Sequence, residues 1–271
     1  MKKINKKLII IKYGSNTLVT NGAHNETSID YENMVAHGRI INRIHHPTII
    51  VSSGAVAFGK TMRNKFEYIK NEVARKRIFS ALGNPHLSIN WDRAISKKQV
   101  LQGLITHRDL TLEVPRESIA EIIYSLFNEG TDNSAVIQVN DNDFVTDEEL
   151  IKIRGGDFGD NDKTTALLAM LCDKIFIETD VIFNTSSNGV LENGNTVPLM
   201  LADNLKNSYI EKICGANKTS VGTGGMNTKL KIIRDMIHNT EKTTAYIING
   251  KNPRQLQEVL HGKSTGTRIY K

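Results

Sequence analysis

Cysteine is scarce in this 271-residue sequence, and its two cysteines, Cys172 and Cys214, lie far apart in ordinary surroundings. Such spacing implies neither a disulfide framework nor a metal site. Long apolar runs are also missing, because no stretch approaches the roughly 20 residues of a membrane span. The run that follows the basic segment MKKINKK stops after four residues, whereas a secretory signal needs about 7–15. We therefore expect a cytoplasmic protein that contacts no membrane.

Aromatic residues make up only 6% of the chain, and the basic residues that give it a net charge of +6 and a pI near 9.2 are scattered. No RNA- or DNA-binding signature accompanies them. We therefore expect no nucleic-acid partner and interpret the excess charge as a solvated surface, which an enzyme with polyanionic substrates would also tolerate. A basic nucleic-acid-binding protein is the alternative, and salt-dependent elution from heparin would test it.

Linkers are absent as well, since the sequence has no proline-rich, Ser/Gly-rich or low-complexity tract and no clear repeat. With 39% hydrophobic and 24% charged residues, the composition is that of an ordinary globular protein. Its length suits one large α/β domain or two small ones. We predict a single domain over residues 1–271.

Short β-branched runs that end in turn residues alternate with helix-like segments along the chain. The expected strands are residues 8–14, 48–53, 135–141, 174–180 and 243–250. The expected helices are residues 31–43, 65–82, 117–129, 163–172, 227–238 and 253–261. Alternation of this kind favours a mostly parallel sheet with helices on both faces. The predicted fold class is α/β, a three-layer α/β/α sandwich around a mostly parallel central sheet.

Residues 54–61, GAVAFGKT, match the P-loop pattern G-x-x-x-x-G-K-[ST] and follow an apolar, strand-like run. In a P-loop the backbone amides between the glycines curl around phosphate. The intervening residues Ala55 to Phe58 instead resemble the first turn of a buried helix. Two interpretations of Lys60 are therefore open, a phosphate ligand and an ordinary helical residue.

Sheets of the predicted kind bind their ligands outside the carboxyl ends of the strands. Four expected strands end there in polar or glycine-rich residues: KYGS at 12–15, SSGA at 52–55, NDND at 140–143 and TD at 179–180. Two more loops have this character, FGDND at 158–162 and VGTGGMNTK at 221–229. Taken singly, NDND has the composition of an Asx-rich turn and FGDND that of a helix N-cap. TGGMNTK is harder to dismiss, because glycines and threonines before a helix form an anion nest.

Together, in this order and spacing, the motifs resemble those of the amino-acid kinase family, and within it the members that phosphorylate glutamate. The family carries K-x-G-S/T, S-G-A-x-x-x-G, N-E-N-D, G-D-N-D, T-D and G-T-G-G-M-x-T-K. All six occur here between residues 8 and 230, with Asp141 in place of the glutamate, and a glycine-threonine pair typical of the family's ending is present as Gly266-Thr267. The resemblance places Lys60 on the helix after the amino-acid-binding loop, which favours an accidental P-loop match.

The resemblance implies transfer of the γ-phosphoryl group of ATP to the γ-carboxylate of L-glutamate, giving L-glutamyl 5-phosphate and ADP in the first step of proline biosynthesis. A carboxylate with a pKa of about 4.3 is already deprotonated at neutral pH, so the reaction needs no general base. It needs cationic groups that neutralise charge on the transferred group. Two alternatives are a related kinase of another small acid, such as carbamate, aspartate, acetylglutamate or a phosphonate, and a non-catalytic nucleotide- or amino-acid-binding regulator.

Site roles follow from the resemblance, position by position. The expected catalytic residues are Lys12, Asp162 and Lys229, with Asp162 orienting the two lysines. The expected substrate-binding residues are Ser53, Gly54, Ala55, Asn140, Asp143 and Asn161, among which Asp143 would pair with the substrate ammonium and Asn161 with a carboxylate. The expected ATP-binding residues are Lys12, Gly14, Thr179, Asp180, Thr223, Gly224, Gly225, Met226, Asn227, Thr228 and Lys229. The expected cofactor is Mg²⁺, held mainly by the ATP phosphates, with no direct protein ligand.

Two departures from the family pattern are visible. After Thr179-Asp180 the family continues with Asp-Gly-Leu-Tyr, whereas residues 181–184 read Val-Ile-Phe-Asn, a difference on the adenosine side of the site. Bacterial members often carry a C-terminal PUA domain, and this sequence ends at Lys271, so we expect a form without it. The resemblance also implies a homo-oligomer, a dimer or a tetramer, and functional coupling to glutamate-5-semialdehyde dehydrogenase.

Overall fold

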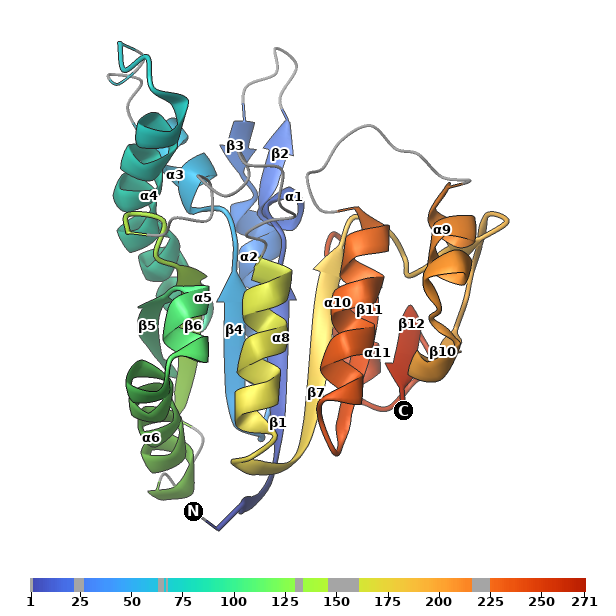
Figure 1. The fold of residues 1–271 in the computed structure, drawn as a ribbon. Helices are drawn as coiled ribbons and strands as arrows, with labels where there is room; N and C mark the ends of the chain where they lie inside the picture. Colours follow the sequence, from blue (N-terminus) through green and yellow to red (C-terminus); the bar gives the residue numbers. More distant parts are fainter. Residues whose placement is uncertain are drawn as a thin grey trace.

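An eight-stranded sheet, in the order β10-β12-β11-β7-β1-β4-β6-β5, forms the centre of the structure (Figure 1). The computed structural model describes residues 2–21, 27–62, 66, 68–129, 134–145, 161–215 and 225–271. The strands of the sheet are β1 (Ile4–Tyr13), β4 (Thr48–Ser52), β5 (Gln99–Ile105), β6 (Ala135–Asp141), β7 (Phe176–Thr185), β10 (Leu199–Leu201), β11 (Thr243–Asn249) and β12 (Thr267–Tyr270). β12 pairs antiparallel with β11, whereas the other pairs of this sheet are parallel.

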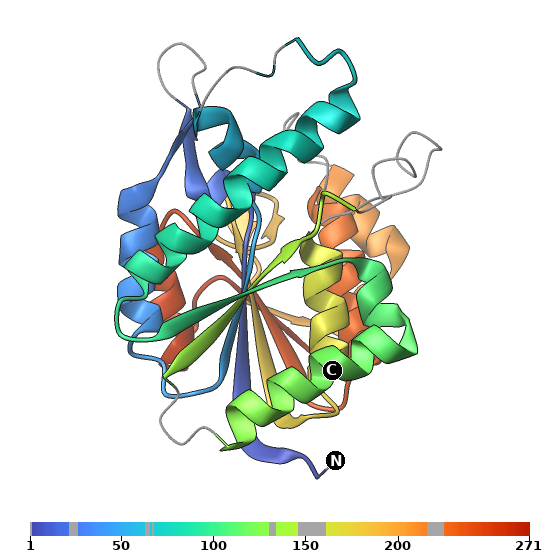
Figure 2. The ribbon, with the colours of Figure 1, turned by 90° about the vertical axis from the view of Figure 1, so that its left-hand side faces the viewer.

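Helices cover both faces of the sheet, as Figures 1 and 2 show from two sides. One layer contains α5 (His107–Thr111), α6 (Glu113–Glu129), α8 (Asn161–Cys172), α9 (Asn207–Gly215) and α10 (Met226–His238). The opposite layer contains α2 (Tyr31–Ile41), α3 (Ala55–Met62), α4 (Glu72–Ala94) and α11 (Pro253–Leu260). Smaller elements are α1 (Ser15–Leu18), η1 (Ala202–Asn204) and the hairpins β2 (Val19–Asn21)–β3 (Thr27–Ile29) and β8 (Leu191–Glu192)–β9 (Asn195–Thr196).

The two hydrophobic cores lie on opposite faces of the central strand β1. Leu8 and Ile10 belong to the core beneath α8 and α10, whereas Ile9 and Ile11 belong to the core beneath α2 and α4. Successive side chains of a strand point to opposite faces, and both faces of this strand are covered by helices. A strand buried in this way is apolar at consecutive positions, which explains the uninterrupted run Leu8-Ile9-Ile10-Ile11.

The predicted fold class, a mostly parallel sheet between two helical layers, is confirmed. Each predicted strand and helix overlaps an observed one, but two are displaced. The helix predicted at 65–82 is α4, which begins at Glu72 and continues through Gly83-Asn84-Pro85 to Ala94. The strand predicted to end at residue 180 continues as β7 to Thr185. Among the segments without a prediction, β5 escaped notice because its QVLQGLI sequence mixes polar and apolar residues at an exposed sheet edge.

Candidate active site

Two lysines converge on one carboxylate at the carboxyl edge of the sheet, the upper edge in Figure 1. Lys12 lies near the end of β1, Asp162 is the second residue of α8, and Lys229 lies in the first turn of α10. The Nζ atom of Lys12 lies 2.7 Å from Oδ1 of Asp162, and Nζ of Lys229 donates a hydrogen bond to Oδ2. The structure therefore brings together the three residues that the resemblance named as catalytic.

All three side chains of this cluster are buried, with exposed fractions of 4% for Lys12, 1% for Asp162 and 7% for Lys229. Burial by itself would raise the pKa of the Asp162 carboxyl, but the neighbouring ammonium groups of Lys229 and Lys12 outweigh it and hold this pKa well below its usual range. Asp162 is therefore ionised throughout the physiological range, and its two oxygens fix the separation of the two ammonium groups.

Two further residues shape the surroundings of the lysines. The Nζ atom of Lys229 lies 5.4 Å from the ring centroid of Phe183, a fully buried residue of β7, so a cation–π contact adds to the ion pair. Gly14 follows β1, and a β carbon placed there would lie 3.6 Å from the ammonium nitrogen of Lys12. Any longer side chain at this position would compete for the space in front of that ammonium group.

The amino-acid side of the predicted site is joined to the cluster through Asn161, the residue that precedes Asp162. Its Nδ2 donates to Oγ of Ser53, at a distance of 2.6 Å, so the loop after β4 touches the start of α8. Its Oδ1 is buried and has no hydrogen-bond partner among the described residues. Gly54 follows Ser53 with a φ of +111°, a conformation that favours glycine, and Ala55 begins α3.

Asn140, in β6, and Asp143, in the turn after it, are connected by two residues that the sequence did not single out. Ser80 donates to the carboxylate of Asp143 at 2.5 Å, and Asn140 donates to Oδ1 of Asn84 at 2.6 Å. Ser80 and Asn84 are one turn apart on α4 and both are buried. Their four-residue spacing indicates that both side chains lie on one face of a helix. This inference from the sequence requires that residues 80–84 be known to be helical.

Asp141, which stands in place of the family's glutamate, joins the same strand end to α8. The Thr164 hydroxyl donates to its carboxylate at 2.6 Å, and Nε2 of His107 lies 2.9 Å from that hydroxyl oxygen. Since the hydroxyl proton is used by Asp141, the imidazole donates through Nε2. His107 and Thr164 also lacked any signal in the sequence, and they hold α8 against the carboxyl end of β6.

The structure contradicts the predicted place of Thr179 and Asp180 at a strand end. Both lie inside β7, whose carboxyl end is Thr185, and Asp180 pairs with Ile9, in the middle of β1. The carboxylate of Asp180 instead forms an ion pair of 2.6 Å with Lys7. The predicted strand ends at the Thr-Asp pair, whereas the β-branched run continues beyond it to Thr185.

With the end of β7 at Thr185, the loop that follows reads Ser186-Ser187-Asn188-Gly189-Val190-Leu191. Residues 181–184, which were compared with the family's Asp-Gly-Leu-Tyr, therefore lie within β7 and not in the loop after it. Gly189 has a φ of +141°, and a β carbon there would lie 2.7 Å from Oγ1 of Thr267. That hydroxyl accepts from the backbone N–H of Val190 at 2.8 Å, so the glycine-threonine pair noted near residue 267 fixes this loop.

The P-loop match has a structural origin in helix packing. A β carbon on Gly59 would lie 1.9 Å from the carbonyl oxygen of Phe79, and one on Gly83 would lie 1.8 Å from that of Ala55. Both glycines are therefore needed for α3 and α4 to cross in backbone contact. Lys60 lies on α3 with an exposed side chain, and its expected place on a helix is confirmed.

The remaining ATP-binding expectations concern the start of α10. Thr223 and Gly224 lie outside the described residues. Gly225 is the N-cap of α10, in extended conformation and with no side-chain cap, and Met226, Asn227 and Thr228 form the first turn with Lys229. Backbone N–H groups at such a position point toward the positive end of the helix dipole, where anions bind.

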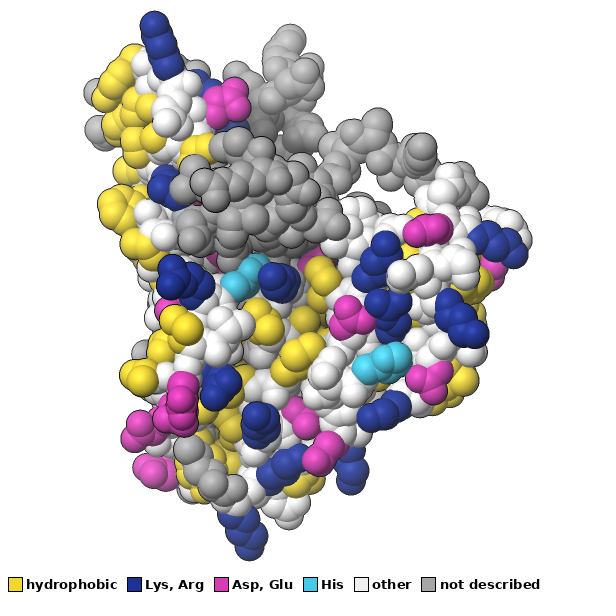
Figure 3. Space-filling view, in the orientation of Figure 1, with side chains coloured by type: hydrophobic (Ala, Val, Ile, Leu, Met, Phe, Trp, Pro, Cys, Tyr) yellow, Lys and Arg dark blue, Asp and Glu magenta, His cyan; other side chains and the backbone are white. Residues whose placement is uncertain are grey.

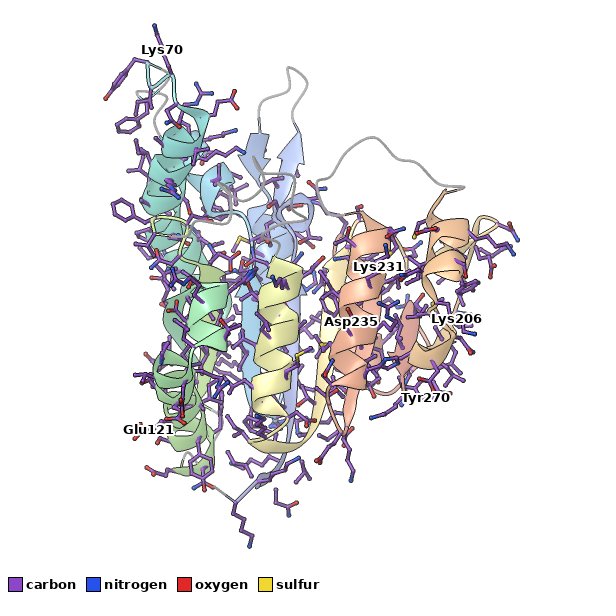
Figure 4. The ribbon with its side chains drawn as sticks, in the orientation of Figure 1. Lys70, Glu121, Lys206, Lys231, Asp235 and Tyr270 are labelled. Atoms are coloured by element: carbon purple, nitrogen blue, oxygen red, sulfur yellow. The ribbon has the colours of Figure 1, made fainter. Side chains whose placement is uncertain are left out.

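On the face that Figure 3 shows, charged groups are mixed in sign. Figure 3 shows Lys and Arg interspersed with Asp and Glu over α9 and α10. On α10 itself, Lys231 and Asp235 lie on the outer face (Figure 4), whereas Lys229 is buried. Within the part of the chain that the structure describes, no three His, Cys, Asp or Glu residues converge as metal ligands, and no helix has the length and apolar character needed to cross a bilayer.

Known proteins resemble this chain in fold and in sequence. A solved carbamate kinase from Giardia lamblia, bound to AMP-PNP, superimposes with a TM-score of 0.63 over 98% of this chain and 99% of that one, and its 16% identity shows the fold alone. Glutamate 5-kinase of Ligilactobacillus salivarius is 32% identical over 98% of this chain and 96% of its own length. Glutamate 5-kinase of Dehalococcoides mccartyi strain CBDB1 is 29% identical, over 97% and 68%. A model of the amino acid kinase family matches residues 7–249, and the chain therefore belongs to the amino acid kinase family.

Proposed function

We propose that this chain phosphorylates the γ-carboxylate of L-glutamate with ATP, giving L-glutamyl 5-phosphate and ADP, the first step of proline biosynthesis. The observation that carries the proposal is the buried Lys12–Asp162–Lys229 cluster directly beside the contact between Asn161 and Ser53. Family membership supports the reaction type, and the relatives named glutamate 5-kinase support the acceptor.

The chemistry asks for charge neutralisation rather than proton transfer. A γ-carboxylate oxygen forms a bond to the γ-phosphorus of ATP, and the bond between this phosphorus and the bridging oxygen breaks, leaving its electron pair on ADP. No proton moves, because the attacking carboxylate is already ionised. The ammonium groups of Lys12 and Lys229 donate hydrogen bonds to the oxygens of the transferred phosphoryl group and stabilise its negative charge. Asp162 holds both ammonium groups in place.

The acceptor is held at its α-amino and α-carboxylate groups by residues that follow β4 and β6 and by the first residue of α8. Asp143 pairs with the substrate ammonium. Asn161 offers both a donor and an acceptor, because Oδ1 has no partner among the described residues and Nδ2 retains a second hydrogen beyond the one given to Ser53. These contacts fix the orientation of the zwitterion, so that its γ-carboxylate points toward the two lysines.

The nucleotide phosphates lie at the first turn of α10, where backbone N–H groups and Lys229 converge. Mg²⁺, when bound, supplies further neutralisation of the β- and γ-phosphates. The carboxylate of Asp162 faces two ammonium groups, and we therefore assign most of the metal ligands to the phosphates. A homo-oligomeric state, coupling to glutamate-5-semialdehyde dehydrogenase, a cytoplasmic location and a single domain stay predictions.

The decisive experiment is ADP release from ATP and Mg²⁺ with a panel of acceptors, with hydroxylamine present to trap an acyl phosphate. We expect turnover and a hydroxamate with L-glutamate, and far less with aspartate, carbamate or acetylglutamate. Lys229→Ala should lower kcat roughly 10²-fold or more, the scale lost with one transition-state donor. Lys231→Ala, two residues later on the outer face of the same helix (Figure 4), is the matched control and should leave kcat unchanged. Equal ADP release without glutamate, or a preference for another acid, would reject the assignment.

A further inference from the structure

Helix α4 carries two buried polar residues that belong to none of the recognised motifs. Ser80 is fully buried and Asn84 is 5% exposed, and their four-residue separation places both side chains on the inward face of the helix. Figure 2 shows α4 lying across the sheet on this side of the molecule. A buried hydroxyl and a buried amide need partners, and those partners lie at the end of β6.

The partners form a directed chain of hydrogen bonds, which we name the α4 polar chain: Asn140, Asn84, Ser80 and Asp143. Asn140 donates to Oδ1 of Asn84 at 2.6 Å, Nδ2 of Asn84 donates to Oγ of Ser80 at 3.2 Å, and Ser80 donates to Asp143 at 2.5 Å. An ionised carboxylate can only accept, so the proton of Ser80 is committed to Asp143, and Ser80 must accept from Asn84. Every donor in the α4 polar chain therefore points toward Asp143, and hydrogen bonds in such a series polarise one another.

The helix that carries Ser80 and Asn84 is itself fixed against the sheet. Gly83 lies in backbone contact with Ala55 of α3, and Nε1 of Trp91 donates to Oγ of Ser52 at 2.8 Å. The backbone carbonyl of Asn84 also accepts from Nε2 of Gln102 at 3.2 Å. The anchor for Asp143 is thus a rigid helix, whereas Asp143 itself lies in the turn after β6.

We propose that Ser80 and Asn84 are positioning residues for the amino-acid acceptor. They hold the carboxylate of Asp143 in the orientation that binds the substrate ammonium, without touching the substrate themselves. This inference rests on the proposed function, in which Asp143 is the ammonium ligand. A carboxylate ordered in advance loses less conformational freedom when the ligand binds, so the effect belongs to acceptor affinity and not to the phosphoryl-transfer step.

The consequence is a selective change in one kinetic constant. Ser80→Ala removes the donor to Asp143 and leaves Nδ2 of Asn84 without its acceptor, but it removes no group from the two lysines. We expect KM for L-glutamate to rise roughly 10-fold, within the range lost with a hydrogen bond to a charged group, while kcat and KM for ATP change less than about 2-fold. A merely structural role would instead lower kcat and disturb both KM values.

The test is steady-state kinetics on four variants of the full chain, with thermal unfolding measured for each. These are Ser80→Ala, Asp143→Asn, the double variant Ser80→Ala/Asp143→Asn, and Ser88→Ala, the matched control two turns further along α4. If Ser80 acts through Asp143, the double variant should show nearly the KM for glutamate of Asp143→Asn alone. Ser88→Ala should behave as the wild type.

The outcomes separate this inference from the proposed function. Wild-type protein that forms no hydroxamate with glutamate would overturn both. An active wild type in which Ser80→Ala acts on kcat or on KM for ATP would overturn the positioning role alone. The same holds if the effects of Ser80→Ala and Asp143→Asn on KM multiply in the double variant. Ser80→Ala could be less stable than the wild type and unfold at a lower temperature. An unchanged KM for ATP would then show that the molecules being assayed are correctly folded, and their KM for glutamate would still test the positioning role.

Discussion

Lys12 and Asp162 form a 2.7 Å ion pair that ties the end of the central strand β1 to the first turn of α8. The second oxygen of the same carboxylate accepts from Lys229, so one side chain orders both cations of the site. Asp162→Asn keeps the shape of the side chain but removes its charge. We expect kcat to fall roughly 10²-fold or more, because misplaced cations cost most when charge is being transferred, with little change in KM for glutamate.

The control for this prediction is Asp235→Asn, on the outer face of α10 (Figure 4), which should leave kcat unchanged. Circular dichroism on both variants verifies that each still folds. Wild-type kcat in Asp162→Asn would show that the lysines need no carboxylate between them.

The crossing of α3 and α4 predicts that substitution of Gly59 lowers the stability of the protein, whereas substitution of its neighbour Lys60 does not. Gly59→Ala inserts a β carbon 1.9 Å from the carbonyl oxygen of Phe79, so the helices must separate, and we expect a loss of about 1–3 kcal/mol in unfolding free energy. Lys60→Ala removes an exposed side chain and should change neither stability nor turnover. Chemical denaturation and steady-state kinetics measure the two effects. If Lys60→Ala were the variant that abolished ATP turnover, residues 54–61 would be a working P-loop after all.

Asp180 is predicted to matter for the sheet and not for the nucleotide. Its carboxylate pairs with Lys7 near the amino-terminal half of β7, away from the strand ends that form the site. Burial raises the pKa of Asp180, and the ammonium of Lys7 opposes that shift. We expect Asp180→Asn to lower the unfolding temperature slightly while KM for ATP stays within about 2-fold. A tenfold increase in that KM would restore the original expectation that Thr179-Asp180 contact ATP.

A buried histidine makes stability depend on pH. His37 lies 3.1 Å from the hydroxyl of Tyr13 through Nδ1 and donates from Nε2 to the carbonyl of Gly250, and burial lowers its pKa from 6.5 to about 4. Between pH 6.5 and 4, the His37 side chain is therefore mostly protonated in the unfolded chain and mostly neutral in the folded one. The resulting stabilisation is complete above pH 6.5 and is lost as the pH falls toward 4.

Between pH 7.5 and 5.5 this term amounts to about 1 kcal/mol of unfolding free energy. His37→Gln removes the titrating group, so its stability should fall less than that of the wild type over this interval. His261→Gln, at an exposed position after α11, is the matched control and should follow the wild type. Denaturant unfolding at the two pH values decides the matter, and parallel pH profiles for wild type and His37→Gln would contradict the assignment.

The sequence predicts the strands best where an apolar run ends in the polar residues of a motif. β1 and β6 were predicted because apolar runs end abruptly in polar residues, and the same polar residues, Lys12 and Asn140, mark the site. Asp162 was predicted from its motif alone, but its contact with two lysines required the fold. Motifs are local, whereas the two ion pairs that join β1 and α10 to Asp162 of α8 depend on how distant segments pack.

Ser80, Asn84 and His107 could not be predicted from the sequence for the same reason. Each is an ordinary polar residue on a helix, and its meaning comes from a partner that lies far away along the chain. The error at Thr179-Asp180 had a different cause, since a β-branched strand gives no internal sign of where its last residue falls. Only pairing with β1 and β11 places the end of β7 at Thr185.

The position of β1 between β4 and β7 has a consequence for synthesis. β1 is synthesised before both of its neighbours, and the second of them is complete only at Thr185. At about 5–20 residues per second, the roughly 170 intervening residues take on the order of 10–30 s. Throughout that time at least one edge of this apolar, β-branched strand has no neighbouring strand to pair with. An unpaired edge of this kind promotes aggregation. Lys7 and Lys12 flank the run Leu8–Ile11, and charged residues in such positions oppose aggregation, so we expect Lys12 to protect the nascent strand before it joins the cluster with Asp162.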